Sequence, residues 1–197
     1  MLNNIVFDLG NVLLNFKPKE YLKTITDDSQ LREKLYENIF NTEYWLELDR
    51  GTLTRKQALN KMIARYPAQK DKIIYIMNNW ISMLTRKKET ISVLEKLYYS
   101  NKYNLYVLSN FHTYAYQEVK RKYDFFQFFD GIVISAEVKS IKPEREVYEY
   151  LLNNYDLQPE ATVFIDDTEE NIKGAEKLSM KTIHYQGDEA LKKLNKL

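Results

Sequence analysis

Asn-Asn-Ile-Val-Phe-Asp-Leu-Gly-Asn-Val-Leu, residues 3–13, is the stretch that decides the fold, because a short apolar run ends there at one carboxylate. Ile5 to Phe7 suits a strand that is buried on both faces of a parallel sheet. Asp8 then lies at the strand end, the edge where open α/β sheets bind their ligands. Gly10 permits a backbone conformation, or a close approach to a ligand, that a side chain would hinder. Taken alone, the stretch favours an aspartate that caps a turn.

The composition favours a protein that acts on small molecules. The 197 residues are enough for one core with a modest insertion, and the net charge of +1 gives no electrostatic reason to expect nucleic acid or an anionic membrane as partner. The absence of cysteine excludes disulfides, thiolate metal sites and cysteine nucleophiles. No apolar run approaches the roughly 20 residues of a membrane span. The start of the chain lacks the pattern of a signal peptide, so we expect a cytoplasmic location. No pattern indicates an oligomeric state.

A block of helices follows the first strand. Between residues 17 and 86 the apolar residues recur at helical spacing, and no strand-like run interrupts them. Thr54 fits the start of a capping box, and Ser29 fits the cap of another helix. The sequence therefore predicts a four- or five-helix insertion at 17–86, within a core made of residues 1–16 and 87–197.

After residue 86 the pattern alternates between helices and strands. Four further strands are expected, at Leu105–Leu108, Gly131–Ile134, Thr162–Ile165 and Lys181–His184. The helices between them include one that should open at Lys142–Pro143, with proline at the favoured first position. Such alternation implies right-handed crossovers and a parallel sheet with helices on both faces. The predicted fold class is therefore α/β, with a Rossmann-like sheet.

Polar residues end three of the expected strands: Asp8, Ser109 with Asn110, and Asp166 with Asp167. A parallel sheet brings these ends to one edge. Carboxylates that meet there would repel one another, and a hard cation with oxygen ligands, Mg²⁺ first among them, is the usual remedy. Lys142 adds a positive charge suited to a phosphate. These residues therefore point together to a site, although each has a simpler explanation when taken singly.

The chain resembles the haloacid dehalogenase-like hydrolase superfamily over nearly its whole length. The matching motifs are Phe7-Asp8-Leu9-Gly10-Asn11-Val12, Leu108-Ser109-Asn110, Lys142-Pro143-Glu144, and Ile165-Asp166-Asp167 with Asn171 four positions later. The helical block occupies the place of the family's α-helical cap. The glycine two residues after the first aspartate is typical of a branch that includes sugar-phosphate phosphatases.

The resemblance implies an activity and a set of roles. Asp8 would attack phosphorus and form an aspartyl-phosphate that water then hydrolyses. Lys142 would neutralise charge in the transition state, and Ser109 with Asn110 would hold phosphoryl oxygens or the adjacent backbone. Mg²⁺ would be bound by Asp8, the Gly10 carbonyl, Asp166 and Asp167. The expected function is a Mg²⁺-dependent phosphatase of small phosphorylated metabolites, with sugar phosphates as the favoured class.

Gly10 is a departure from the family's usual pattern. Most phosphatases of this superfamily carry a second aspartate there, which protonates the leaving group and then activates water. Such help contributes roughly 10²–10⁴-fold. The substitutes considered are Asn11 with a water, Glu47 or Asp49 from the helical block, and His112. A substrate with a good leaving group, such as an anomeric sugar phosphate, would reduce the need.

Two rival functions follow from the same residues. A haloacid dehalogenase also lacks the second aspartate, but it needs no Mg²⁺, and the pair Asp166-Asp167 would be awkward without a cation. A binding domain without turnover is the other alternative; Gly10 favours it, while the intact Asp8 and Lys142 argue against it. Substrate selectivity should come from the helical block, where Tyr44, Trp45 and Arg50 are candidates to line the site.

Overall fold

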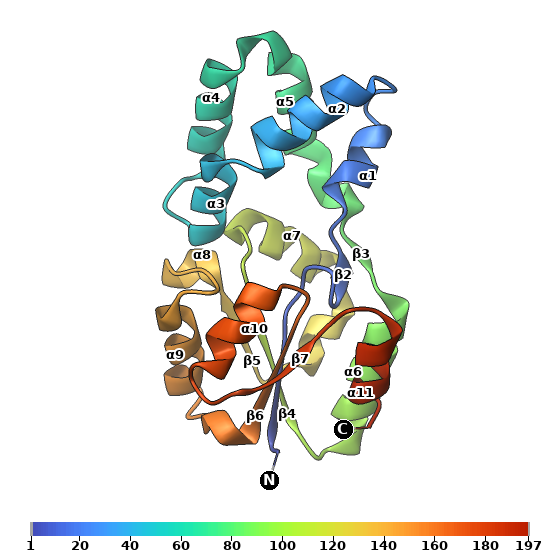
Figure 1. The fold of residues 1–197 in the computed structure, drawn as a ribbon, viewed down its shortest axis with the longest axis vertical. Helices are drawn as coiled ribbons and strands as arrows, with labels where there is room; N and C mark the ends of the chain where they lie inside the picture. The colour runs from blue at the N-terminus through green and yellow to red at the C-terminus, as the bar shows by residue number, and fades with distance from the viewer. Residues whose placement is uncertain (1, 197) are drawn as a thin grey trace.

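A parallel sheet forms the centre of the molecule. The computed structural model describes residues 2–196, and its strands are β1 (Asn4–Phe7), β2 (Leu14–Asn15), β3 (Thr85–Arg86), β4 (Asn104–Ser109), β5 (Gly131–Ile134), β6 (Thr162–Asp166) and β7 (Lys181–His184). Five of them form one sheet in the order β5-β4-β1-β6-β7, with every neighbouring pair parallel (Figure 1). The predicted Rossmann-like sheet is confirmed, and β1 lies at its centre.

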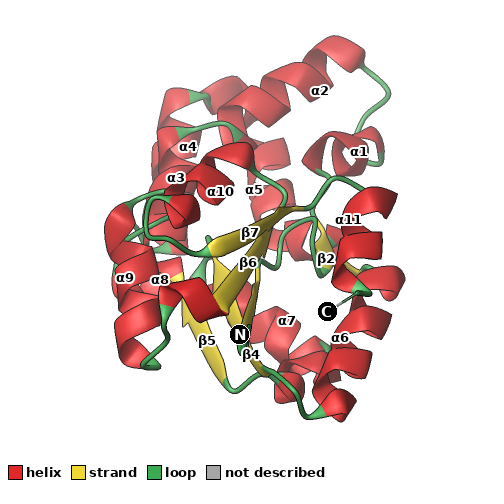
Figure 2. Cartoon of the chain, turned by 60° about the horizontal axis from the view of Figure 1, so that its bottom comes forward, coloured by secondary structure: helices red, strands yellow, loops and turns green. Residues whose placement is uncertain are grey.

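Helices cover both faces of this sheet (Figure 2). The helices are α1 (Pro18–Lys23), α2 (Ser29–Leu35), α3 (Glu43–Arg50), α4 (Arg55–Arg65), α5 (Lys70–Asn79), α6 (Lys88–Ser100), α7 (Thr113–Lys122), α8 (Ser135–Val138), α9 (Arg145–Asn154), α10 (Glu169–Glu176) and α11 (Asp188–Leu194). Alternate side chains of β1 point to opposite faces. Ile5 and Phe7 join one apolar cluster with α6 and α7, and Val6 joins the other with α9 and α10.

Helices α1 to α5 lie beyond the carboxyl ends of the central strands, in the upper part of Figure 1. The chain enters this helical segment after β2 and leaves it through β3, and these two short strands pair antiparallel. Asn15 Nδ2 also donates to Thr85 Oγ1 over 2.9 Å. The expectation that no strand interrupts residues 17–86 was wrong at this point. A two-residue strand leaves no hydrophobic pattern to detect.

Of the two helix caps predicted from the sequence, the structure contains one. Thr54 and Gln57 form the predicted capping box of α4. Ser29, however, is the first residue of α2, and Asp28 caps it by accepting hydrogen bonds from the backbone N–H groups of Gln30 and Leu31. An aspartate caps as well as a serine, and its charge also suits the positive end of the helix dipole.

The helix expected to open at Lys142–Pro143 begins later. Glu144 is the N-cap of α9, whose first residue is Arg145. The carboxylate of Glu144 accepts hydrogen bonds from Ser140 Oγ (3.1 Å) and the Ile141 N–H (3.2 Å), which closes a turn before the helix. Lys142 therefore belongs to a loop, and its placement does not depend on a helix terminus. Helices α8 and α11 had no counterpart in the sequence-based prediction.

A lipid bilayer could not be crossed by any of the helices found between residues 2 and 196, because none is both long and apolar enough.

Candidate active site

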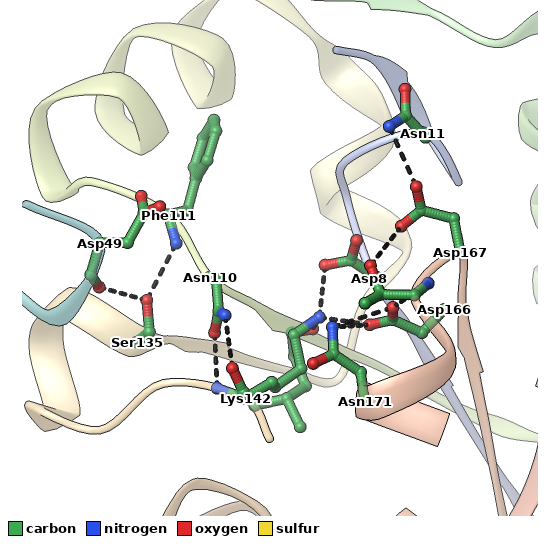
Figure 3. Close-up of polar contacts among 12 residues, drawn as sticks. Asp8, Asn11, Asp49, Asn110, Phe111, Ser135, Lys142, Asp166, Asp167 and Asn171 are labelled. Atoms are coloured by element: carbon green, nitrogen blue, oxygen red, sulfur yellow. Dashed lines mark hydrogen bonds and ion pairs between the residues drawn. The ribbon is translucent and has the colours of Figure 1, made fainter. Parts of the chain in front are cut away.

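Three carboxylates meet at the carboxyl end of the central strands. Asp8 directly follows β1, and its N–H donates to the Ile165 carbonyl over 2.9 Å, so strand pairing fixes its backbone. Asp166 ends β6, and Asp167 comes next. One oxygen from each carboxylate lies within 4.8 Å of the others (Figure 3). Hard oxygen donors at this spacing fit a divalent cation such as Mg²⁺.

Among the described residues, Lys142 is the lysine that forms ion pairs with these carboxylates. Its Nζ donates to Asp8 Oδ1 over 2.7 Å, to Asp166 Oδ2 over 2.6 Å and to the Leu108 carbonyl over 3.0 Å. Its side chain is 1% exposed. A single buried cation therefore faces three carboxylates. The resulting surplus of negative charge is what a bound divalent cation would balance.

The pKa of Asp8 reflects the same surplus of negative charge. Burial, together with the charges of Asp166 and Asp167, raises the pKa of its carboxyl to about 7, and the attraction of Lys142 opposes this rise. Burial likewise raises the pKa of Asp167, while its hydrogen bond from Asn11 opposes the rise. A cation bound between these groups would favour their ionised forms.

Asp166 and Asp167 have different surroundings. Asp166 is fully buried and accepts hydrogen bonds from the Thr168 N–H over 2.8 Å and from Asn171 Nδ2 over 3.0 Å, in addition to the lysine. Asp167 lines the open cavity beside Asp8. The sequence placed the two residues at one site, and the structure shows that Asp167 is the one directed to the cavity.

The backbone after Asp8 departs from one of the two expectations for Gly10, that of an unusual conformation. Gly10 does not adopt a left-handed conformation, and an added Cβ would lie 3.6 Å from Asp8 Oδ2, an ordinary contact. The left-handed residue is Asn11, with φ of 52°. Its Oδ1 accepts from the Phe16 N–H and its Nδ2 donates to Asp167 Oδ2, both over 3.0 Å. Asparagine tolerates this conformation because its side chain bonds locally.

The loop after β4 supports the lysine. Asn110 Nδ2 donates to the Lys142 carbonyl over 2.9 Å, and its Oδ1 accepts from the Lys142 N–H over 2.8 Å. Ser109, the last residue of β4, is 1% exposed and borders the cavity. The amide of Asn110 thus holds the loop that carries Lys142.

A cavity of about 200 Å³ opens above these groups. Its polar floor includes Asp8, Ser109, Asn110, Lys142 and Asp167, and its apolar wall is formed by Leu14, Phe16, Trp45, Trp80, Leu84 and Phe111. Asp49 of α3 is the charged residue that the helical segment contributes to this lining. Of the three predicted lining residues, Trp45 lies in the wall, whereas Tyr44 borders a separate surface hollow with Glu43 and Arg65.

Arg50 joins the helical segment to the core. Its guanidinium makes two hydrogen bonds to the Glu144 carboxylate, of 2.7 and 2.6 Å. The neighbouring backbone is also held, because the Asp49 carbonyl accepts from Ser135 Oγ and the Gly51 carbonyl accepts from Lys139 Nζ, each over 2.5 Å. No local sequence pattern could have paired residues so far apart along the chain. Arg50 is therefore engaged at the edge of the site rather than in its lining.

His112 lies just behind this edge. Its ring packs against those of Trp45 and Trp80, at centroid distances of 4.6 and 5.3 Å. Its Nε2 lies 3.0 Å from Asp49 Oδ1. The residue borders a second cavity of about 280 Å³ and does not line the cavity above Asp8.

Known proteins similar to this chain include phosphatases. It is 25% identical over 179 residues to sesquiterpene phosphatase astK of Aspergillus oryzae, a match that covers 91% of this chain and 87% of that protein. It is 24% identical over 200 residues to drimenol cyclase drtB of Aspergillus calidoustus, covering all of this chain but 37% of that protein.

A solved structure has the same architecture. The HAD family enzyme bt-2542 of Bacteroides thetaiotaomicron, in complex with magnesium and inorganic phosphate, superposes with a TM-score of 0.74 at 25% identity, over 95% of this chain and 96% of that one. The family model that matches residues 2–178 is described as haloacid dehalogenase-like hydrolase. The match includes all four motifs and the strands that carry them, and the chain therefore belongs to the haloacid dehalogenase-like hydrolases.

Proposed function

We propose that this protein is a Mg²⁺-dependent phosphatase of small phosphorylated metabolites that acts through a phosphorylated Asp8. The observation that carries the proposal is the position of the Asp8 carboxylate. It lies at the floor of the cavity, 2.7 Å from Lys142 Nζ, with Asp166 and Asp167 beside it. The similarity to astK, which is named a phosphatase, supports it.

The residues present suit each step of that reaction. An Asp8 oxygen would attack phosphorus as the bond to the leaving oxygen breaks, and water would then release phosphate from the aspartyl group. Lys142 would offset charge on the nucleophile and the phosphoryl oxygens, and Ser109 would contact the phosphoryl group. The fixed contacts of Lys142 to Asp166 and to the Leu108 carbonyl hold its ammonium in place before substrate arrives.

The metal site would consist of Asp8, the Gly10 carbonyl, Asp167 and Asp166. When bound, Mg²⁺ would screen the repulsion between the nucleophilic carboxylate and the anionic phosphate. Asp166 is already held by Asn171 and the Thr168 N–H, so we assign it mainly to orienting Lys142 and completing the charge around the ion. The bt-2542 structure that contains magnesium supports this choice of ion.

We further propose that residues 17–86 act as a cap that closes the cavity and selects the substrate. The aromatic wall formed by Phe16, Trp45 and Trp80 can stack on a sugar ring or contact a hydrocarbon chain. Sugar phosphates are the class implied by the resemblance to the sugar-phosphatase branch. A phosphorylated terpenoid is the class named for astK, and both belong in the substrate screen.

Metal-free dehalogenation fits the site less well. Without a cation, Asp8, Asp166 and Asp167 would share one buried lysine, whereas displacement of a halide needs no such cluster. The test is phosphate release from a panel of phosphorylated metabolites, with and without Mg²⁺, beside halide release from 2-haloacids. Mg²⁺-dependent phosphate release that is lost in Asp8→Asn supports the proposal. Halide release, or no turnover of any phosphate, contradicts it.

A further inference from the structure

The structure distinguishes between the residues that could replace the acid–base side chain missing at position 10. Asn11 uses both ends of its amide in contacts to Asp167 and to the Phe16 N–H. Glu47 is turned to Thr52, whose hydroxyl contacts its side chain and its carbonyl, and it is absent from the cavity lining. His112 borders the other cavity. Of these candidates, Asp49 alone carries a titratable group that lines the cavity above Asp8.

The carboxylate of Asp49 lies against the buried side chain of His112. Its side chain is 16% exposed, and Oδ1 lies 3.0 Å from Nε2 of His112, which is itself 8% exposed. The two atoms lack hydrogen-bond geometry, and among the described residues this nitrogen has no hydrogen-bond partner. The imidazole packs against the rings of Trp45 and Trp80, which also contact each other. His112 is therefore a positioning residue, because its buried imidazole lies against the Asp49 carboxylate and restricts the orientations open to it.

Three contacts from consecutive residues hold this part of α3 against the core. Asp49 accepts from Ser135 through its carbonyl, Arg50 forms the forked pair with Glu144, and Gly51 accepts from Lys139. Gly51 has φ of 73°, and a Cβ there would lie 2.2 Å from the Ala136 carbonyl oxygen. This close approach, which only glycine allows, brings the end of α3 to the rim of the cavity.

We propose that Asp49 is the proton carrier of this enzyme, supplied by the cap in place of a side chain at position 10. In the first step its carboxyl proton passes to the leaving oxygen as that oxygen departs from phosphorus and Asp8 becomes phosphorylated. In the second step its carboxylate takes a proton from the attacking water. The bond between phosphorus and Asp8 then breaks, phosphate leaves, and both carboxyl groups return to their starting states.

The inference rests on the proposed phosphatase function. Its test is a comparison of substrates whose leaving groups differ in their need for a proton. The value of kcat/KM reports the steps up to departure of the leaving group. Asp49→Asn should lower kcat/KM for a simple alkyl phosphate by roughly 10²–10⁴-fold, because an alkoxide needs a proton. For 4-nitrophenyl phosphate, whose leaving group needs none, kcat/KM should stay within a few fold. The second step loses its base, so a burst of nitrophenol should precede slow turnover.

Two further variants separate proton transfer from structural damage. Glu47→Gln removes a carboxylate of the same helix that faces away from the cavity, and it should keep the wild-type ratio of alkyl to aryl rates. Gly10→Asp, placed in the Asp49→Asn background, should recover part of the alkyl rate, because position 10 has ordinary backbone and room for a Cβ. His112→Gln should lower kcat for alkyl phosphates with KM unchanged, and should spare kcat/KM for the aryl substrate.

The outcomes distinguish this inference from the function on which it rests. One outcome is that the wild-type enzyme needs Asp8, while Asp49→Asn lowers kcat/KM equally for alkyl and aryl phosphates or changes neither. That outcome overturns the role of Asp49 and leaves the phosphatase function intact. Absence of phosphate release by the wild type overturns both. A folded Asp49→Asn variant with a selective loss on alkyl phosphates, partly restored by Gly10→Asp, supports both.

Discussion

Arg50 forms a forked ion pair with Glu144, two residues beyond Lys142, across a separation of 94 residues along the chain. Both bonds are short, at 2.7 and 2.6 Å. The planar guanidinium matches the carboxylate in a way that an ammonium cannot. The pair therefore connects the proposed cap to the loop that carries the lysine, and the state in which it forms is the state in which Asp49 lines the cavity.

Replacing this fork should weaken catalysis. Arg50→Lys keeps the charge but loses one of the two bonds, so we expect kcat/KM to fall by up to about fivefold, the upper range for partly exposed ion pairs. The control is Arg145→Lys, which alters an exposed pair with Glu149 on the outer side of α9. Equal effects of the two substitutions would show that the Arg50 fork has no part in closing the site.

The pair of Arg50 and Glu144 should make the stability of the protein depend on pH. The hydrogen bonds from Arg50 lower the pKa of Glu144 from 4.5 to about 2, although its partial burial opposes this. Its contribution is therefore complete above pH 4.5 and is lost as the pH falls toward 2. The difference in Tm between wild type and Glu144→Gln should shrink across that window. The side chain is 36% exposed, so added salt should also reduce the difference. A difference that stays constant from pH 7 to pH 2 would refute the assignment.

Lys142 should be essential to the folded state as well as to turnover. Lys142→Met removes the cation from a buried cluster and leaves Asp8 and Asp166 uncompensated, which typically costs about 3–5 kcal/mol in the free energy of unfolding. Urea unfolding without Mg²⁺ measures this loss. Lys173→Met, which breaks an exposed pair with Glu169, is the matched control and should change stability little. A Lys142→Met protein as stable as the control variant would contradict the buried ion pair.

Asp167→Ala should weaken Mg²⁺ binding, because this carboxylate faces the cavity beside Asp8. The measurement is calorimetric titration of the folded variant with Mg²⁺, which requires no turnover. Asp27→Ala removes an exposed carboxylate on the cap and should bind Mg²⁺ like the wild type. Unchanged affinity in Asp167→Ala would mean that the ligand set is wrong.

Much of the fold could be predicted from the sequence because its signals are local. The strands at 131–134 and 181–184 were predicted with the bounds that the structure gives. Asp8 and Asp166 could be assigned to one edge because parallel strands run in the same direction. The period of apolar residues likewise indicated helices in the part of the chain where α1 to α5 form.

The parts that escaped prediction depend on contacts between distant residues. Nothing near Arg50 indicates that it pairs with Glu144, and nothing near Asp49 indicates that Ser135 and His112 surround it. Gly10 was the natural choice for an unusual backbone, yet Asn11 adopts it, because its amide can bond both the Phe16 N–H and Asp167. These contacts are set by how the helical segment rests on the core.

The central claim, a phosphatase with Asp8 as nucleophile, is tested most directly by trapping the phosphorylated enzyme. Purified protein would be mixed with Mg²⁺ and an aryl phosphate, quenched in acid and digested, and its peptides analysed by mass spectrometry. A phosphoryl group on the peptide that contains Asp8, absent from Asp8→Asn and accumulating further in Asp49→Asn, is the result we predict. Steady phosphate release without a phosphorylated Asp8 peptide in any variant, or full activity in Asp8→Asn, would contradict the account.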